Sequence, residues 1–287
     1  MNILVVGGTG TVGSQVVQEL LARREKPRVL TRSRDKLATL PTNVAGVVGD
    51  TAKPETLPPA FQGIETVVLI TSLSPNETAE GSAVVAAAKK AGTKRIVFLS
   101  VHDVEKCPEA PHFASKIEIQ KAIGASGLAW TTVMPNNFFQ NDLRFRQPIM
   151  EYGVYPQPFG GVGLSRVDVR DIAEAIAAAT TESGHEGRRY PLVGPEVLTG
   201  AATAALWSRH LDRDVRYGGD DLAAWALQSK AFMPDWMIED LRVMYGFFQE
   251  KGLRASDEEL RQQARILKHP PRRFGDFVKE TAAAWCQ

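Results

Sequence analysis

Residues 1–20, MNILVVGGTGTVGSQVVQEL, combine a short apolar run, Ile3 to Val6, with four glycines and a second apolar pattern of different spacing. The first run is continuous and rich in β-branched residues, as in a buried strand, and the second has the spacing of a helix. Between them, Gly7, Gly10 and Gly13 form G-x-x-G-x-x-G, one residue longer than the G-x-G-x-x-G fingerprint of dinucleotide-binding folds. A strand, a glycine turn and a helix in this order predict that backbone N–H groups hold the pyrophosphate of a dinucleotide.

The same alternation of strand and helix continues beyond this stretch. Further strand-like runs are expected at residues 29–31, 44–48, 66–70, 95–99 and 130–134. Helical patterns lie between the runs, clear at 12–24, 77–91 and 113–125 and weaker at 34–40 and 55–61. Strands that alternate with helices predict an α/β fold, here a Rossmann-type doubly wound parallel sheet with right-handed crossovers.

The pattern changes after Pro135. Residues 152–163, YGVYPQPFGGVG, are rich in glycine, proline and aromatic residues and predict a loop or a short hairpin. A strand-to-helix step follows at 167–180, where Asp168 or Asp171 can cap the helix. Beyond it we expect strands at 190–193 and 214–217 and three helical stretches between 222 and 285.

Two domains follow from this division. We expect a dinucleotide-binding domain at residues 1–150, with residues 164–182 packed back on it. Residues 151–163 and 183–287 are expected to form a smaller, mostly helical C-terminal lobe that binds the substrate.

The segment RVLTRSRDKL, residues 28–37, indicates which dinucleotide binds. An NAD site usually has an acidic residue at the end of the second strand, where it accepts hydrogen bonds from the ribose hydroxyls. Here Thr31 is followed by Arg32, with Arg34 and Lys36 close behind. A guanidinium can pair with a 2′-phosphate through two hydrogen bonds, so this segment favours NADP. The alternative is a solvated basic helix start, which the helix dipole disfavours.

Composition and charge exclude several classes of protein. The 34 basic and 33 acidic residues give a net charge of +1, with no basic run, so nucleic acid is not a favoured partner. No apolar run is long enough to span a membrane. Cys107 and Cys286 are far apart in the sequence, which argues against a disulfide framework and for a reducing, cytoplasmic location. The five histidines are not at metal-ligand spacing, so no metal site is expected.

Several segments together resemble a known family. They are GGTGTVG, TRSRDK, VVGD at 47–50, IVFLS at 96–100, HFASK at 112–116, MPNNFFQN at 134–141, VDVRDIA and YPLVGPEVLT. In this order they resemble the NmrA-like group of atypical short-chain dehydrogenases/reductases, over roughly residues 1 to 200. That group includes NADPH-dependent quinone reductases, isoflavone and phenylcoumaran ether reductases, and redox-sensing regulators.

The glycine motif, the basic segment and this resemblance together give the expected binding residues. The residues expected to bind the cofactor, NADP, are Gly7, Thr9, Gly10, Thr11, Val12, Gly13, Arg32, Lys36, Asp50, Thr51, Thr71, Ser72, Lys116, Pro135 and Asn136. The resemblance also implies that Asn137, Phe138 and Phe139 lie near the substrate.

Three residues are expected to take part in catalysis. The resemblance implies that Lys116 binds the nicotinamide ribose and takes part in proton transfer in some members of the group. Ordinary short-chain dehydrogenases have Tyr-x-x-x-Lys, whereas this sequence has His112 four residues before the lysine. A histidine can act as a general acid near neutral pH, or it can simply shape the pocket at the start of the helix. Ser100, at the end of the fifth strand, can donate a hydrogen bond to a substrate carbonyl.

Two classes of function remain open. In the first, the protein is an NADPH-dependent reductase that transfers a hydride to a small apolar carbonyl, quinone or enone. In the second, it is a non-catalytic NADP(H) sensor that acts through a protein partner; the missing tyrosine keeps this alternative open. Substrate specificity is expected from the helical lobe, notably around Trp225, Phe232, Trp236 and Tyr245, although aromatic residues at such spacing are more often part of a core.

Overall fold

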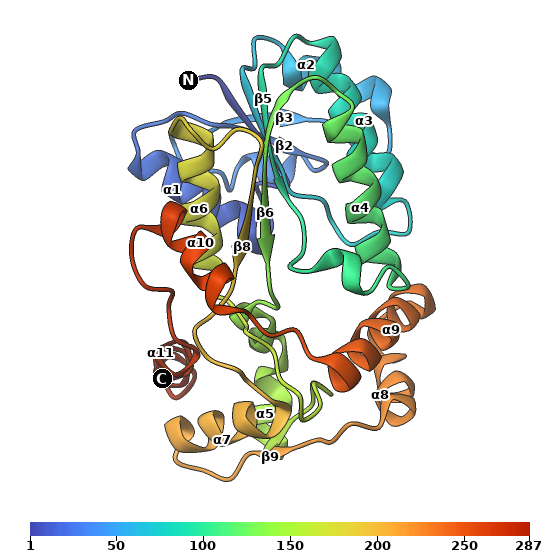
Figure 1. Cartoon of the computed structure of the whole chain (residues 1–287), viewed down its shortest axis with the longest axis vertical. Helices are drawn as coiled ribbons and strands as arrows, with labels where there is room; N and C mark the ends of the chain where they lie inside the picture. The colour runs from blue at the N-terminus through green and yellow to red at the C-terminus, as the bar shows by residue number, and fades with distance from the viewer.

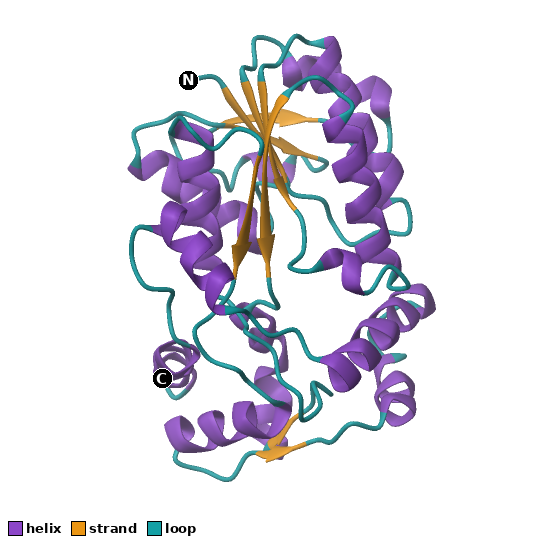
Figure 2. Cartoon of the chain, in the orientation of Figure 1, coloured by secondary structure: helices purple, strands orange, loops and turns teal.

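A seven-stranded parallel sheet forms the centre of the computed structural model, which describes residues 1–287 (Figures 1 and 2). The strand order is β3-β2-β1-β4-β5-β6-β8. The strands of this sheet are β1 (Ile3–Val6), β2 (Arg28–Thr31), β3 (Ala45–Val48), β4 (Thr66–Leu69), β5 (Arg95–Leu99), β6 (Ala129–Pro135) and β8 (Arg188–Leu192). The strand order reverses direction between β1 and β4, and in such sheets ligands bind outside the carboxyl ends of the strands at this point.

Helices cover both faces of the sheet (Figure 1). One face packs against α1 (Thr11–Ala22), α6 (Val169–Thr181) and α10 (Asp257–Leu267). The opposite face packs against α2 (Pro58–Phe61), α3 (Glu77–Lys90) and α4 (Pro111–Gly124). The expected α/β fold is therefore confirmed.

Alternation along the strands explains these two layers. In β1, Ile3 and Val5 belong to the apolar core under α1, whereas Leu4 and Val6 belong to the core under α3. Successive side chains of a strand point to opposite faces, so a strand buried on both faces needs a continuous apolar run. Each such side chain contributes about 1.5 to 3 kcal/mol when fully buried. This burial holds the carboxyl ends of the strands at one edge of the sheet.

The weaker helical patterns form short turns. Residues 34–40 contain only a 3-10 helix, η1 (Asp35–Leu37), and residues 55–61 contain η2 (Pro54–Thr56) followed by the single turn of α2. Asp168 caps α6 by accepting a hydrogen bond from the Arg170 N–H at 2.8 Å, which is one of the two expected caps.

The C-terminal lobe lies beyond the carboxyl ends of the strands (Figure 1). Its helices are α5 (Arg146–Tyr152), α7 (Gly200–Leu211), α8 (Leu222–Ser229), α9 (Asp235–Lys251) and α11 (Phe274–Trp285). Two short strands, β7 (Val154–Tyr155) and β9 (Arg216–Tyr217), pair in parallel. The segment 152–163 therefore makes no hairpin with itself, because its strand pairs with a partner about sixty residues later. None of the helices is both long enough and apolar enough to cross a bilayer.

Two elements of the segment expected to form the lobe, residues 183–287, contact the main sheet. β8 is the edge strand of that sheet, and α10 packs against β8 and α6. Tyr190 and Leu192 of β8 are buried in the core under α1 and α6. The Gln263 amide of α10 bonds both the N–H and the carbonyl of Val193, at 2.9 and 2.8 Å. We therefore propose that β8 and α10 belong to the dinucleotide-binding domain.

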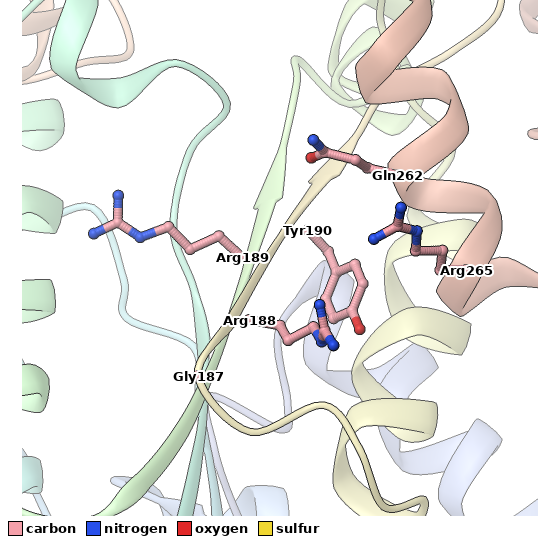
Figure 3. Close-up of a pocket in the computed structure, with 6 residues that line it drawn as sticks. All are labelled: Gly187, Arg188, Arg189, Tyr190, Gln262 and Arg265. Atoms are coloured by element: carbon pink, nitrogen blue, oxygen red, sulfur yellow. The ribbon is translucent and has the colours of Figure 1, made fainter.

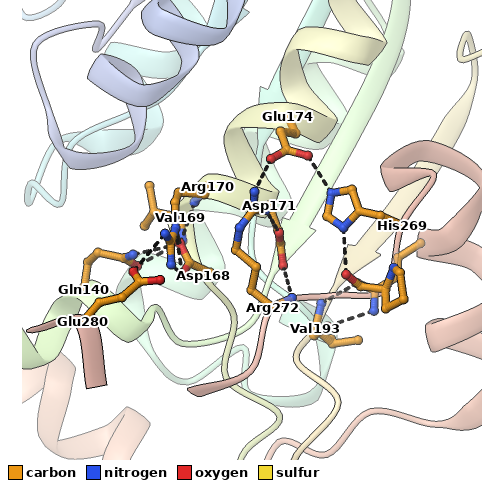
Figure 4. Close-up of polar contacts among 12 residues, drawn as sticks. Gln140, Asp168, Val169, Arg170, Asp171, Glu174, Val193, His269, Arg272 and Glu280 are labelled. Atoms are coloured by element: carbon orange, nitrogen blue, oxygen red, sulfur yellow. Dashed lines mark hydrogen bonds and ion pairs between the residues drawn. The ribbon is translucent and has the colours of Figure 1, made fainter. Parts of the chain in front are cut away.

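A polar clasp holds the segment between α10 and α11 against α6 (Figure 4). Arg272 donates to Glu174 at 2.6 Å and also pairs with Asp171, which is fully buried. The His269 ring bonds the Glu174 carboxylate at 2.6 Å. Burial alone would lower the pKa of His269, but hydrogen bonds to the Pro270 carbonyl and to Glu174 outweigh it, so the pKa is raised.

Candidate active site

The glycine turn lies between β1 and α1, at the carboxyl end of a central strand. Gly7 has a φ of +84°, and a Cβ there would lie 2.3 Å from the Ile70 carbonyl oxygen, so only glycine fits. A Cβ on Gly13 would lie 2.1 Å from the Gly7 carbonyl oxygen. Gly10, the N-cap of α1, offers no side-chain acceptor, so the first N–H groups of the helix are available to an anion. These residues fit a dinucleotide pyrophosphate.

Three other residues of the turn are expected cofactor contacts. Thr9 is half-buried and Thr11 is exposed, so both side chains are accessible from outside the turn. The Val12 side chain is buried in the core under α1. Val12 can therefore contact a cofactor only through its backbone.

The cations expected to bind a 2′-phosphate follow β2. Arg32, Arg34 and Lys36 are all exposed, and none of them forms an ion pair with a carboxylate. They do not begin a regular helix, because η1 has only three residues. Three uncompensated cations at the end of the second strand fit a phosphate group on the adenosine ribose.

The expected residues after β3 and β4 also lie at the carboxyl edge of the sheet. Asp50 accepts a hydrogen bond from the Ala52 N–H at 3.1 Å, and the Thr51 hydroxyl donates to Glu80 at 3.1 Å. Thr71 is half-buried, and Ser72 is exposed. Their contact with the cofactor stays a prediction.

Lys116 belongs to a buried polar network that joins α3, α4 and the end of β4. Its ammonium lies 2.7 Å from the Glu77 carboxylate and donates to the Thr71 hydroxyl at 2.5 Å. The Thr71 hydroxyl donates to Glu77 at 2.5 Å, and the Ser115 hydroxyl donates to Glu77 at 2.9 Å. The Glu77 side chain is only 2% exposed, so the ammonium compensates a carboxylate that would otherwise be buried without a counter-charge. An ammonium has three N–H donors, so one remains for a ligand.

His112 pairs with a residue of the lobe. Its Nδ1 lies 2.5 Å from an Asp240 carboxylate oxygen, and its backbone N–H lies 3.4 Å from the same oxygen. Asp240 belongs to α9 and is 3% exposed, whereas the His112 side chain is 13% exposed. The imidazole also packs edge-to-face on Phe113, with ring centroids 4.7 Å apart.

Ser100 directly follows β5, the fifth strand, as expected. Its side chain is buried, and its hydroxyl accepts a hydrogen bond from the Gln120 amide of α4 at 3.0 Å. In this contact the hydroxyl accepts, and its own hydrogen has no acceptor in the protein. The expected hydrogen bond to a substrate carbonyl stays a prediction.

The segment after β6 is also largely internal. Pro135 ends β6 and is buried, and its carbonyl accepts from the His102 N–H at 2.9 Å. The Asn136 amide donates to the Leu253 carbonyl at 2.7 Å and to the His102 ring at 3.1 Å, and it is 1% exposed. The Asn136 side chain therefore joins β6 to the lobe and faces away from solvent.

The three expected substrate contacts differ in exposure. Asn137 and Phe138 are half-buried, and the Asn137 amide oxygen accepts from Arg166 at 3.0 Å. Phe139 is completely buried, with its ring 5.0 Å from that of Phe274. Phe139 is thus a core residue of the lobe, and Asn137 and Phe138 stay candidates for the substrate side.

Sequence reasoning did not identify Glu77 or Asp240. Glu77 stands in the first turn of α3, where an acidic residue needs no explanation beyond the helix dipole. Asp240 lies within α9, 128 residues from His112. No local pattern connects such distant residues, so only the folded chain reveals these pairs.

Two groups of histidine and acidic residues have the proximity of metal ligands. In His102, Asp103 and Glu259, the His102 ring already bonds Glu259 at 2.7 Å and Asn136 at 3.1 Å. In the clasp on α6, Arg272 occupies the carboxylates. In both groups the side chains already form hydrogen bonds or ion pairs within the protein, which is the arrangement of hydrogen-bonded clasps.

A surface hollow lies between the start of β8 and α10, at the amino end of the strands (Figure 3). It is lined by Gly187, Arg188, Arg189, Tyr190, Gln262 and Arg265. The glycine turn and Lys116 lie at the opposite, carboxyl ends of the strands. The hollow is therefore separate from the candidate site.

A family model described as the NmrA-like family matches residues 1–278. The chain belongs to the NmrA-like family. Among curated relatives of this NmrA-like chain, NAD(P)H azoreductase of Xenophilus azovorans is 35% identical, with 99% of each chain covered. The (4-alkanoyl-5-oxo-2,5-dihydrofuran-3-yl)methyl phosphate reductase of Streptomyces griseus is 34% identical, again with 99% of each chain covered.

A solved structure gives the same result for the fold. The NADPH-dependent quinone oxidoreductase QOR2 of Escherichia coli superposes with a TM-score of 0.84 at 25% identity, covering 97% of this NmrA-like chain and 99% of that protein. The expectations of an NmrA-like chain, a Rossmann-type fold and an NADP-dependent oxidoreductase are therefore confirmed at the level of the family.

Proposed function

We propose that this NmrA-like protein uses NADPH to reduce a small, apolar carbonyl, quinone or enone. The observation that carries the proposal is the arrangement at the start of α4, where Lys116 and His112 lie on one helix face beside the carboxyl ends of β4 and β5. NADPH supplies the hydride when it is bound. The protein then has to bind the dinucleotide, hold the acceptor beside it and supply a proton.

The residues divide these tasks between them. The glycine turn binds the pyrophosphate, and Arg32 with Lys36 binds the 2′-phosphate. The remaining N–H donor of Lys116 binds a ribose hydroxyl, while Glu77 and Thr71 hold the ammonium in place. His112 is the group at this site that can supply a proton near neutral pH.

The lobe offers two kinds of aromatic residue to an acceptor. Trp225 and Tyr245 are buried and pack edge-to-face, with centroids 5.0 Å apart, so they are part of the core. Phe232 is 67% exposed and Trp236 is 36% exposed. Trp236 lies one turn before Asp240 on α9, so it shares a face with the partner of His112. We propose Phe232 and Trp236 as contacts for an apolar acceptor.

The names of the relatives support reduction of a conjugated acceptor. The first relative is named for azo compounds, and the name of the second describes a ring with a carbonyl and a double bond. Both classes accept a hydride at a polarised double bond, as quinones and enones do. The alternative of a non-catalytic sensor with a protein partner is not favoured. Both relatives are named as reductases, and the similarity extends over almost their whole length. Both cysteines are unpaired, which agrees with a proposed cytoplasmic location.

The test measures NADPH oxidation by the purified protein with a panel of quinones, enones and azo dyes. The proposal predicts turnover with at least one acceptor and a loss of about 100-fold or more in Lys116→Ala. Lys121→Ala is the matched control, since this lysine of the same helix is exposed and pairs only with Glu118. Tight NADPH binding without turnover of any acceptor would contradict the proposal and favour the sensor.

A further inference from the structure

We propose that Asp240 positions His112 as the proton donor of the reduction, so that the acid of this enzyme is a histidine–aspartate pair built from two domains. This inference rests on the function proposed above. It adds the residue of the lobe that orients the ring, and it specifies which ring nitrogen faces the acceptor.

The hydrogen bond to Asp240 fixes the proton on one nitrogen of the ring. A carboxylate can only accept, so the 2.5 Å contact requires that His112 Nδ1 carries the hydrogen. In the neutral ring, Nε2 is then a lone pair, and in the protonated ring it is a second N–H donor. The pair therefore presents Nε2 as the reactive nitrogen in both states.

Nε2 is available to a ligand. No protein group forms a hydrogen bond with Nε2. The atom is also not completely buried. The His112 side chain as a whole is 13% exposed, so the ring is not sealed inside the core. A ring held from one side and open on the other has the arrangement of a general acid and not of a core histidine.

The position of the ring places Nε2 beside the site. His112 and Lys116 are four residues apart and share a face of α4. Lys116 donates to Thr71, which lies two residues beyond the end of β4, so this face lies over the carboxyl ends of the strands. The cofactor is expected at the same edge of the sheet.

The charges around His112 leave Asp240 as its one direct partner. Lys116, on the same helix, is compensated by Glu77 of α3. From the segment before α4, burial raises the pKa of the Cys107 thiol, which is therefore neutral, and Glu109 is exposed. No other carboxylate bonds the ring.

The reaction balances with this pair. Acceptor, NADPH and one proton give the reduced acceptor and NADP⁺. The acceptor gains the hydride and its electron pair, and the protonated His112 transfers the Nε2 proton to the atom that becomes negative. The ring is left neutral with its hydrogen on Nδ1, still bonded to Asp240, and takes up a proton from water before the next turnover.

The first test compares acceptors that need a proton with one that does not. Menadione, cyclohexenone and the azo dye methyl red each need a proton after hydride addition, whereas the triarylmethyl cation crystal violet becomes neutral by hydride addition alone. In His112→Gln we expect kcat to fall about 100-fold with the first three and to stay within about twofold with crystal violet. An equal loss with crystal violet, or no loss with the others, overturns the proposal.

The second test is independent of turnover. In the protein labelled with ¹⁵N-histidine and without NADPH, the neutral His112 ring should carry its proton on Nδ1, and the signal is assigned by its loss in His112→Gln. Asp240→Leu should release the ring to the other tautomer, while Asp240→Asn, which keeps an acceptor oxygen, should retain it. A ring with its proton on Nε2 in the wild-type protein overturns the proposal.

The Asp240 variants also separate positioning from general damage. Asp240→Asn keeps the hydrogen bond without the charge, so its kcat should lie between those of the wild type and Asp240→Leu, with NADPH affinity unchanged. The matched control is Glu239→Gln, since this neighbouring residue is exposed and pairs with Arg242. In the wild type kcat should fall as the pH rises, because the donor must be protonated, and His112→Gln should lose this dependence.

The results distinguish the two proposals. If the wild-type protein reduces none of the acceptors, both fail. If it reduces them and His112→Gln reduces them equally well, the proposed function stands and the proton-donating pair is overturned.

Discussion

Replacing Arg32 with alanine should weaken NADPH binding without affecting the fold. Arg32 is exposed, follows the last residue of β2 and has no carboxylate partner, so no interaction within the protein is lost. A charge-assisted hydrogen bond contributes about 1.5 to 3 kcal/mol, and the lower end applies at an exposed site. About 1.4 kcal/mol corresponds to a tenfold change in Kd. We therefore expect Kd for NADPH to rise at least tenfold.

The assay is a fluorescence titration with NADPH and NADH in parallel. NADH lacks the 2′-phosphate, so its Kd should change less than twofold in Arg32→Ala. Lys26→Ala is the control, because Lys26 is an exposed cation before the opposite end of β2. Equal losses for both nucleotides would refute the assignment of Arg32 to the phosphate, and a loss in Lys26→Ala would indicate a general charge effect.

Three further predictions concern the turn, the clasp and the lobe. A Cβ on Gly10 would contact only the Gly7 carbonyl oxygen, at 3.4 Å, so the Tm of Gly10→Ala should lie within a few degrees of that of the wild type. The variant should bind NADPH at least tenfold more weakly, and unchanged affinity would show that the pyrophosphate lies elsewhere. The raised pKa of His269 gives stability that is complete below the pKa of the unfolded chain and is lost as the pH rises through the folded value. His269→Gln should therefore flatten the fall of Tm as the pH rises above 6.5, the ordinary pKa of histidine. Asp142→Ala leaves the completely buried Arg166 without its counter-charge, so the free energy of unfolding, measured in urea, should fall by about 3 to 5 kcal/mol. A decrease below about 1 kcal/mol would contradict this.

The sequence is informative wherever local pattern alone determines the structure. The six strands from β1 to β6 are found within one or two residues of the predicted ranges, because each contains a short run of apolar and β-branched residues. Five of them are largely buried, whereas β3, at the edge of the sheet, is mostly exposed. The turn before α1 is also predictable from local sequence, because a side chain at Gly7 or Gly13 would collide with backbone atoms and only glycine fits there.

Local pattern is not sufficient where distant segments of the chain pair. A run of five residues such as β8 has no feature that assigns it to the main sheet or to the lobe, and β7 finds its partner β9 only in the folded chain. The polar residues behave in the same way. Asn136 and Ser100 lie at strand ends, as predicted, but their side chains bond inward to Leu253 and Gln120.

Hydride transfer from NADPH to the acceptor is the central claim, and isotope transfer tests it most directly. The protein is incubated with cyclohexenone and NADPH that carries deuterium in place of both hydrogens on C4 of the nicotinamide, and the product is analysed by mass spectrometry. The account predicts one deuterium in the reduced product and an equal amount of NADP⁺. Product without deuterium, or NADPH that stays unoxidised with every acceptor of the panel, would contradict it.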